Sequence, residues 1–298
     1  MSMRIGIVIV NYNRGRLVCE IVSVFAKYNA IDYLVVVDNC STDDSRHLLK
    51  NIEGGKVKCL FPEDNGGYAR GNNIGLNYLR KEQKCEICFV VNPDVFFEEY
   101  VITTVVSYME KNPDYAIMTC AQKDPLSKRP SCQYGKRLFD TFGLHLMNYF
   151  NILRHFYILK KYYAYSYDGN NKGIIDISEA LGSFYGIQMK CFENDEILDS
   201  GTFLYWEEQL LGFKVSRMGY KIGFIPSCLY EHRHIQFSST ANSKSLRLFK
   251  YNLDSQRYLQ QKYLHFNFLQ RKIIFLAEII SLIERWLINY MKGILKNR

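Results

Sequence analysis

The stretch VVNPDVFF, residues 90–97, ends a strongly apolar run by placing Asn92, Pro93 and Asp94 where the run stops. The run begins at residue 86, and EICFVV (86–91) is typical of a strand that is covered on both faces. Proline stiffens the chain and removes a backbone donor at the point where the strand ends. The stretch therefore raises the question of why a buried strand presents one carboxylate beside a proline.

Three earlier segments also read as strands: RIGIVIV (4–10), YLVVV (33–37) and the weaker residues 56–60. After the first of them, apolar residues recur at helical spacing: Leu17, Val18, Ile21, Val22 and Phe25. Residues 68–81 predict a second helix, and Ser41-x-x-Asp44 resembles a capping box at the start of another. This alternation of strands and helices predicts an α/β fold, with a mostly parallel sheet and helices on both faces.

Polar residues follow three of the predicted strands: Asn11, Tyr12 and Asn13; Asp38 and Asn39; and Asn92 to Asp94. For any single site, a turn or a helix cap is the simpler interpretation. Open α/β sheets bind their ligands at the carboxyl ends of the strands, and three polar sites at that edge favour a ligand cleft.

Residues 65–75, NGGYARGNNIG, contain four glycines. Glycine allows backbone N–H groups to approach a phosphate closely. The spacing matches neither the dinucleotide-binding motif nor the P-loop, so on its own this segment is a weak indication.

Together, five segments resemble the family 2 glycosyltransferases, which have the GT-A fold. They are VIVNYNR (8–14), VVVDNCSTDDS (35–45), NGGYARGNNIG (65–75), VVNPDVFF (90–97) and FLYWEEQLLGFKVSRMGYKIGFIP (203–226). The resemblance covers about residues 4–120 and 176–240. The motifs look closest to the rhamnosyltransferase-like branch that builds bacterial surface polysaccharides.

The resemblance gives Asp94 a role as a ligand of Mg²⁺ or Mn²⁺ beside the donor's diphosphate. The family's usual D-x-D is Asn92-Pro93-Asp94 here, which leaves one carboxylate fewer. Asp38 matches the residue that accepts the N3–H of uracil or thymine. The expected donor-binding set is Asn11, Asn13, Asp38, Asn39, Asn65, Gly66, Arg70, Gly71 and Asn72. Arg70 stands where the family often has glycine, and both a phosphate contact and a solvent-exposed position are open for it.

On the acceptor side, the resemblance places the catalytic base at Glu208, although Glu207 precedes it and the family usually reads Glu-Asp. Adjacent helix residues differ by about 100° in direction, so one of the two faces the acceptor. The alternative is that both acids only complement the dipole of a helix start. A second metal-site residue is expected at His232, with His234 as the alternative.

Composition limits the class of protein. The net charge of +8 comes from residues 241–298, which contain 11 Lys and Arg but only three acids, Asp254, Glu278 and Glu284. The other 240 residues hold 27 charges of each sign. That distribution argues against a nucleic-acid-binding core. Nine cysteines show no disulfide framework, and Cys85-x-x-Cys88 lacks the second pair of a zinc site, so a reducing cytoplasm is expected. No secretory signal and no spanning helix are expected.

We expect a catalytic domain over residues 1–240 and a basic helical region over 241–298. Residues 139–167 carry ten Phe and Tyr and form either a helical subdomain or an acceptor-side lid. Residues 273–294 separate into polar and apolar arcs on a helix. The apolar arc would bind an anionic membrane surface or pack against the catalytic domain or a second copy of the chain.

The resemblance thus implies an inverting, metal-dependent transfer of a sugar from a UDP- or dTDP-sugar to a hydroxyl of a glycan, with the glycan carried on a lipid in the synthesis of bacterial surface polysaccharide. The enzyme would be cytoplasmic and peripheral at the inner face of the membrane. Two rivals are a non-catalytic membrane scaffold of the same fold and a sugar-nucleotide pyrophosphorylase. The latter is disfavoured because NYNRGR contains only Gly15 where such enzymes have a glycine-rich loop.

Overall fold

The computed structural model describes residues 3–123, 130–131, 135, 138, 140–150, 173–233 and 241–296. Its strands are β1 (Ile5–Asn11), β2 (Tyr33–Asp38), β3 (Val57–Leu60), β4 (Ile87–Val91), β5 (Val95–Phe96), β6 (Tyr115–Lys123), β7 (Pro130–Ser131), β8 (Ile175–Ile177), β9 (Phe184–Gln188) and β10 (Lys221–His232). Its helices are α1 (Gly15–Phe25), α2 (Ser45–Asn51), α3 (Gly67–Lys81), α4 (Glu99–Lys111), α5 (Phe142–Tyr149), α8 (Glu207–Arg217), α9 (Ala241–Leu259) and α10 (Phe268–Lys296). A short 3-10 helix η1 (Met189–Cys191) follows β9, and a π-helix η2 (Gln260–Leu264) follows α9.

The described strands form one sheet in the order β3-β2-β1-β4-β9-β6-β10-β5. The four strands from β3 to β4 are parallel, and β9 then runs antiparallel to both β4 and β6. The predicted α/β fold is confirmed, with the difference that the sheet is mixed beyond β4.

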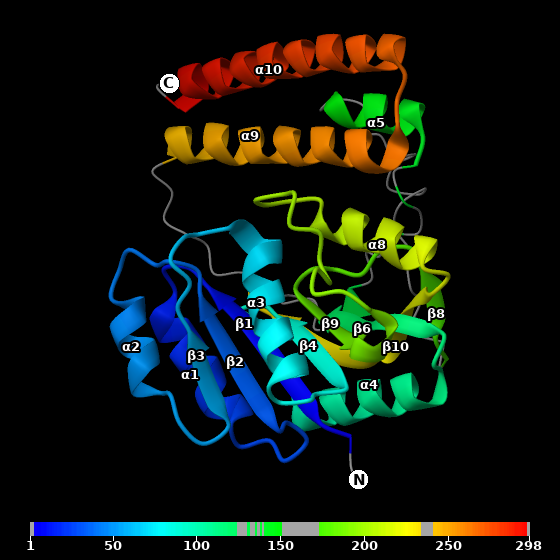
Figure 1. Cartoon of the computed structure of the whole chain (residues 1–298). Coiled ribbons are helices and arrows are strands. Elements are labelled where there is room, and N and C mark those ends of the chain that lie inside the picture. The colour runs from blue at the N-terminus through cyan, green and yellow to red at the C-terminus, as the bar shows by residue number, and fades with distance from the viewer. Residues whose placement is uncertain are drawn as a thin grey trace.

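Alternate residues of β1 point into two separate cores. Ile5, Ile7 and Ile9 pack with α1, α2 and α4 on one face, while Val8 packs with α3 and α8 on the other. This period of two follows from the pleat of a strand and explains why β1 is apolar on both sides. Figure 1 shows the resulting layers, with α4 below the sheet, α8 above it and α3 in front of it.

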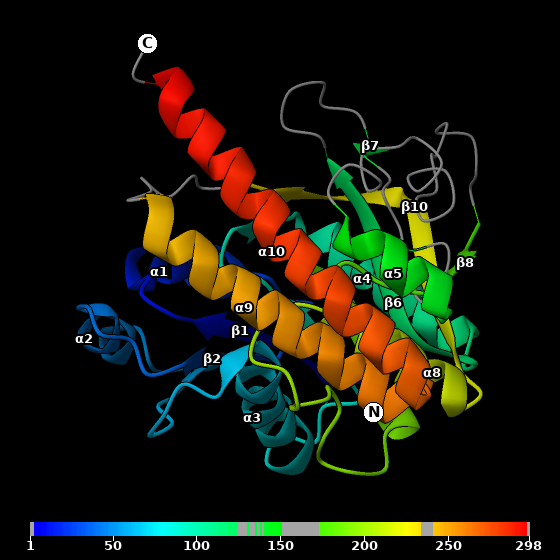
Figure 2. The same ribbon diagram turned by 90° about the horizontal axis from the view of Figure 1, so that it is seen from above.

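Helices α9, α10 and α5 form an outer layer on the side of α3 and α8 (Figures 1 and 2). A small apolar cluster joins the three helices through Tyr149, Leu253, Ile274 and Ala277. Beside it, Arg257 of α9 pairs with the buried Glu278 of α10, with Nε–Oε1 at 3.0 Å, and Tyr149 donates to the same carboxylate at 3.1 Å. We define α5, α9, η2 and α10 as the outer layer.

The orientation of α10 is the reverse of that of an ordinary surface helix. Its buried residues include the polar Glu278 and Ser281, 2% and 3% exposed, while Trp286 is 64% exposed. The outward residues are Phe275, Leu276, Ile279, Ile280, Leu282, Ile283, Trp286, Leu287 and Tyr290. The predicted apolar arc is therefore exposed, and Glu278 and Ser281 of the predicted polar arc are buried. No helix of the described ranges is long and apolar enough to cross a bilayer.

Some expectations fall elsewhere. His234 and residues 151–167 of the aromatic stretch lie outside the described residues, whereas α5 belongs to that stretch and packs against α10. The capping box is wrong: α2 begins at Ser45 after Asp44, whose side chain makes no capping bond. The hydroxyl of Ser41 instead donates to Asp38 at 2.5 Å, and Ser41 lies four residues before the start of α2.

Candidate active site

The ends of β1 and β2 bring the predicted base-binding residues together. The strands are parallel and in register, so Asn11 lies opposite Asp38, and both side chains are buried. The Asn11 amide donates to Oδ1 of Asp38 at 2.7 Å, and Oδ2 is 3.4 Å from the backbone nitrogen of Ser41. Because each carboxylate oxygen accepts two hydrogen bonds, Oδ2 keeps capacity for a donor from a ligand.

Asn13 lies in the same loop in the left-handed conformation, with φ 54°, which asparagine tolerates better than most residues. Its side-chain oxygen accepts from the backbone N–H of Thr42 at 2.8 Å. Asn13 thus connects the loop after β1 to the loop after β2 by this hydrogen bond.

Asn39 connects these loops to the glycine-rich segment. Its amide nitrogen donates to Asn65 Oδ1 at 2.8 Å and to the Gly67 carbonyl at 2.9 Å. Within the described structure, the buried oxygens Asn39 Oδ1 and Asn72 Oδ1 have no hydrogen-bond partner. An unsatisfied buried acceptor costs about 1–3 kcal/mol, so both oxygens have capacity for a hydrogen bond from a ligand or an ordered water.

The glycines of this segment serve close packing as well as approach to a ligand. A Cβ on Gly71 would lie 3.0 Å from Val10 Cγ1, so this residue lets α3 lie against β1. A Cβ on Gly66 would lie 2.2 Å from Arg70 Cδ, since the arginine side chain folds over it. The Arg70 guanidinium pairs with Asp64 at 2.7 Å, with both side chains largely exposed.

Asp94 and His232 are 138 residues apart and meet because β5 pairs antiparallel with the end of β10, where His232 lies opposite Val95. The imidazole Nε2 is 3.1 Å from Asp94 Oδ1, and Arg14 Nη1 is 3.1 Å from Oδ2. Burial raises the pKa of Asp94, but the imidazole and the guanidinium outweigh it, so this pKa lies below its ordinary value.

The donor atoms at this point fit a divalent cation. One carboxylate and one imidazole are ligands that Mn²⁺ and related ions accept, and a bound diphosphate would supply further oxygens. No group of three or more His, Cys, Asp or Glu side chains arranged for a metal occurs in the described part of the chain.

Glu207 and Glu208 begin α8 directly after two residues in the left-handed conformation, Tyr205 (φ 76°) and Trp206 (φ 71°). For residues with a Cβ this conformation costs about 1–2 kcal/mol each, so the surrounding contacts must hold it. The backbone thereby turns sharply just before the two acids.

The two carboxyl groups lie in a region with little compensating charge. Burial, together with the neighbouring Glu208 carboxylate, raises the pKa of Glu207 to about 8, and its Oε1 has no partner among the described residues. Burial also raises the pKa of Glu208, against the opposing effect of the backbone N–H groups of Glu208 and Gly182. In addition to burial, the Glu208 carboxylate raises the pKa of Glu207, whereas backbone N–H groups oppose the rise at Glu208, so Glu208 is the better candidate for the ionised base.

A cleft of about 530 Å³ connects the two acidic regions. Its lining comes from the start of α3, the end of β4, β6, the segment before β9, the segment before α8 with the start of that helix, and the end of β10: Tyr68, Asn92, Gln122, Leu181, Gly182, Ser183, Leu204, Tyr205, Glu207, Glu208 and His232. A Cβ on Gly182 would lie 2.3 Å from Glu208 Oε1, so only glycine leaves room for the acid there.

Three further residues belong to the site and were not singled out from the sequence. Arg14 pairs with Asp94, and Tyr68 donates to the Gly182 carbonyl at 2.5 Å. Glu179 precedes β9, and burial together with Glu208 raises its pKa to about 8. Arg14 stands within the quoted NYNR motif, but nothing in the sequence near Glu179 indicates its proximity to Glu208.

The family model described as "Glycosyl transferase family 2" matches residues 6–163, more than half of the chain. The chain belongs to glycosyl transferase family 2. Low-salt glycan biosynthesis hexosyltransferase Agl10 of Haloferax volcanii is 23% identical over 223 residues, which are 74% of this chain and 64% of that protein. Glycosyltransferase GlyG of Streptococcus pneumoniae serotype 4 is 30% identical over 121 residues, 39% of each chain. The chain thus spans less than two thirds of the length of either relative.

The fold is also similar to those of solved structures. GalNAc-T7 with UDP, GalNAc and Mn²⁺ matches at a TM-score of 0.59 and 13% identity, over 87% of this chain and 48% of that one. The complex of S. aureus TarS 1–349 with UDP matches at 0.51 and 14% identity, over 91% of this chain and 70% of that one. At such identities the likeness shows the fold, which is GT-A.

Proposed function

We propose that this family 2 member is an inverting glycosyltransferase that moves a sugar from a UDP- or dTDP-sugar to a hydroxyl of a glycan. One observation carries the proposal: a single cleft is lined by Asn92 and His232 at the sheet edge and by Glu207 and Glu208 opposite them. A donor diphosphate at the first end and an acceptor hydroxyl at the second would place the anomeric carbon between them.

The nucleoside would lie over the ends of β1 and β2. Asp38 Oδ2 would accept the N3–H of the base, and the unsatisfied oxygens of Asn39 and Asn72 would accept further donors of the nucleotide. The structures of TarS contain UDP or UDP-GlcNAc, which supports a uridine donor without excluding dTDP.

Asp94 and His232 would hold Mg²⁺ or Mn²⁺ against the diphosphate, and the similar GalNAc-T7 structure contains UDP and Mn²⁺. When bound, the ion neutralises charge that develops on the departing nucleoside diphosphate. Arg14 also pairs with Asp94 and, after His232, contributes to the lowered pKa of this carboxyl.

Glu208 would take the proton from the attacking hydroxyl, since the neighbouring Glu207 retains its own proton to a pH of about 8. The hydroxyl then attacks the anomeric carbon opposite the leaving diphosphate, and the configuration inverts without a covalent intermediate. Leu204 and Tyr205 line the cleft next to this acid and would contact the acceptor.

The outward face of α10 supports a lipid-linked acceptor at a membrane. Its exposed apolar residues lie beside Arg271 and Lys272, and apolar surface flanked by cations is typical of a helix that lies in an anionic bilayer surface. The assignment to bacterial surface polysaccharide and to a rhamnosyltransferase-like branch depends on sequence resemblance.

The transferase is tested by incubating the full-length protein with a panel of UDP- and dTDP-sugars, with and without Mn²⁺, and measuring release of nucleoside diphosphate. We expect metal-dependent release from one donor and a matching thermal stabilisation, which follows RT ln(1 + [L]/Kd). Binding of UDP or dTDP without any release would favour the non-catalytic scaffold. Formation of a sugar nucleotide from a sugar phosphate would favour the pyrophosphorylase.

Membrane binding is tested by cosedimentation with vesicles of phosphatidylcholine containing phosphatidylglycerol. We expect Ile283→Glu with Trp286→Glu to abolish binding, while Tyr100→Glu, an exposed aromatic on α4, leaves it unchanged. Salt should weaken the association without removing it, because the apolar face remains. Wild-type protein that ignores these vesicles and sediments as a dimer would show that α10 binds a second copy instead.

A further inference from the structure

The segment of residues 199–206, here called the base-side loop, leads into α8 and places Leu204 and Tyr205 on the cleft wall. It ends in the two left-handed residues Tyr205 and Trp206, directly before Glu207. Two such residues in succession keep their geometry only where neighbouring contacts fix them. The contacts that do so come mainly from the outer layer.

Asp199 is the centre of the first set of contacts, and its side chain is only 2% exposed. It accepts hydrogen bonds from Tyr258 at 2.7 Å, Tyr263 at 2.8 Å and Lys262 at 2.8 Å. All three donors belong to the end of α9 or to η2. The buried carboxylate therefore has its charge balanced by the outer layer rather than by the catalytic domain.

The outer layer also contacts the residues nearest to the two acids. Ser255 of α9 donates to the Leu204 carbonyl at 2.9 Å, and the ring centroids of Phe203 and Tyr251 lie 4.5 Å apart. Trp206 stacks on the buried His145 of α5, with centroids 5.6 Å apart and planes at 21°.

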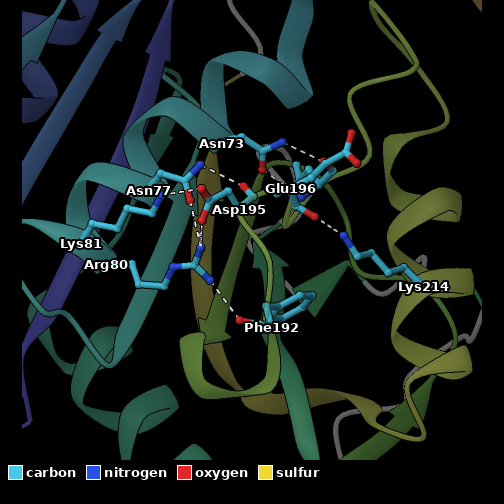
Figure 3. Close-up of polar contacts among 9 residues, drawn as sticks. Asn73, Asn77, Arg80, Lys81, Phe192, Asp195, Glu196 and Lys214 are labelled. Atoms are coloured by element: carbon cyan, nitrogen blue, oxygen red, sulfur yellow. Dashed lines mark hydrogen bonds and ion pairs between the residues drawn. The ribbon is translucent and has the colours of Figure 1, made fainter.

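From the opposite side, α3 holds the segment that precedes the base-side loop, as Figure 3 shows. Asn73 exchanges two hydrogen bonds with Leu198, at 2.7 and 2.9 Å, and Arg80 pairs with Asp195 at 2.6 Å. Helix α3 also carries the glycine-rich donor segment, so the base-side loop lies between the donor helix and the outer layer.

We propose that Tyr258, Lys262 and Tyr263 are positioning residues, which hold the base-side loop through Asp199 so that Glu208 faces the acceptor. This inference rests on the proposed role of Glu208. It gives the outer layer a part in the reaction itself: α10 presents an apolar face outwards, while α9 and η2 hold the catalytic end of the cleft.

A misplacement of about 1 Å at a reacting group can cost about 100-fold in rate. We therefore expect Lys262→Met and the double variant Tyr258→Phe with Tyr263→Phe to lower kcat by about 10- to 100-fold, with the Kd for UDP and Mn²⁺ unchanged within about twofold. Lys262→Arg should restore most of the rate. Lys250→Met, which changes an exposed lysine on the preceding helix α9, is the matched control and should behave as wild type.

A second measurement needs no sugar donor. The chain has two tryptophans, so Trp286→Phe leaves Trp206 as a single reporter beside Glu207. In that background, Lys262→Met should shift the emission to the red and increase quenching by acrylamide, while circular dichroism stays unchanged. Unchanged Trp206 emission together with wild-type kcat would overturn the inference. A wild-type protein that releases no nucleoside diphosphate would instead reject the proposed function, and the fluorescence would still decide whether the outer layer holds the loop.

Discussion

The two ends of the cleft hold carboxyl groups in opposite surroundings. Asp94 lies between Arg14 and His232, each at 3.1 Å, and these neighbours keep its pKa below the ordinary value despite its burial. Glu207 is about as buried, but its nearest charged neighbour is another carboxylate, and its pKa is raised to about 8. Burial alone does not decide the charge of an acid; the partners in reach decide it.

The difference matches the chemistry that each end would perform. A metal and a diphosphate require an acid that stays ionised, whereas proton transfer requires an acid whose pKa lies near the working pH.

The largest effect is expected at the acceptor end. Glu208→Gln should lower kcat by about 10²–10⁴, the usual contribution of a general base, with donor affinity nearly unchanged. Steady-state kinetics and UDP calorimetry measure the two quantities separately. Glu207→Gln is the matched control and should be milder. Equal losses in both variants, or a loss only in donor binding, would remove Glu208 from the role of base.

At the donor end, Asp94→Asn should abolish the enhancement of UDP or dTDP binding by Mn²⁺. Mutation of a residue that only hydrogen-bonds to a metal ligand typically lowers metal affinity by about 10–100-fold. Loss of the carboxylate ligand itself should lower the affinity further. Calorimetry in the presence and absence of Mn²⁺ measures the effect. A variant with full metal enhancement would show that Asp94 serves only its ion pair with Arg14.

Stability should depend on pH in opposite directions at the two ends. The raised pKa of Glu207 stabilises the fold fully below its ordinary value of 4.5, and this contribution is lost as the pH rises through about 8. Asp94 has a lowered pKa in the folded protein. Its contribution to the free energy of unfolding is present above its ordinary pKa and is lost as the pH falls through the lowered pKa. Between pH 5.5 and 8.5, Glu207→Gln should therefore lose less stability than wild type.

We expect this difference to be about 1–3 kcal/mol, the cost of leaving a buried polar group without compensation. Urea unfolding at the two pH values measures it. Glu179, whose pKa is also about 8, is present in both proteins and cancels in the comparison. Parallel pH profiles of the two proteins would mean that Glu207 is ionised throughout this range.

The smallest effect is expected at Arg70. Its ion pair with Asp64 is largely exposed, so Arg70→Ala should change the free energy of unfolding by less than about 1 kcal/mol. The affinity for UDP then decides between the two roles left open by the sequence. A loss of more than about tenfold would make Arg70 a phosphate contact and extend the charged donor end to α3.

Local sequence pattern determined much of the fold. Apolar runs such as residues 4–10 and 33–37 are strands because β-branched residues suit a sheet that is covered on both faces. The polar residues after them lie at one edge because parallel strands end on the same side, and Asn11 therefore reaches Asp38. These features depend only on neighbouring residues in the sequence or on the regular parallel pairing of β1 with β2.

Contacts between distant segments decided the rest. His232 reaches Asp94 through the antiparallel pairing of β5 with β10, and Glu179 approaches Glu208 through the entry into β9. The helical pattern of residues 273–294 predicted two faces but not which of them is buried. Glu278 is buried because Arg257 and Tyr149 contact its carboxylate. A periodic pattern defines the faces of a helix. Which face is buried depends on the side chains that the rest of the chain places against the helix. A charged side chain is buried only where an oppositely charged or hydrogen-bonding partner compensates for the loss of water.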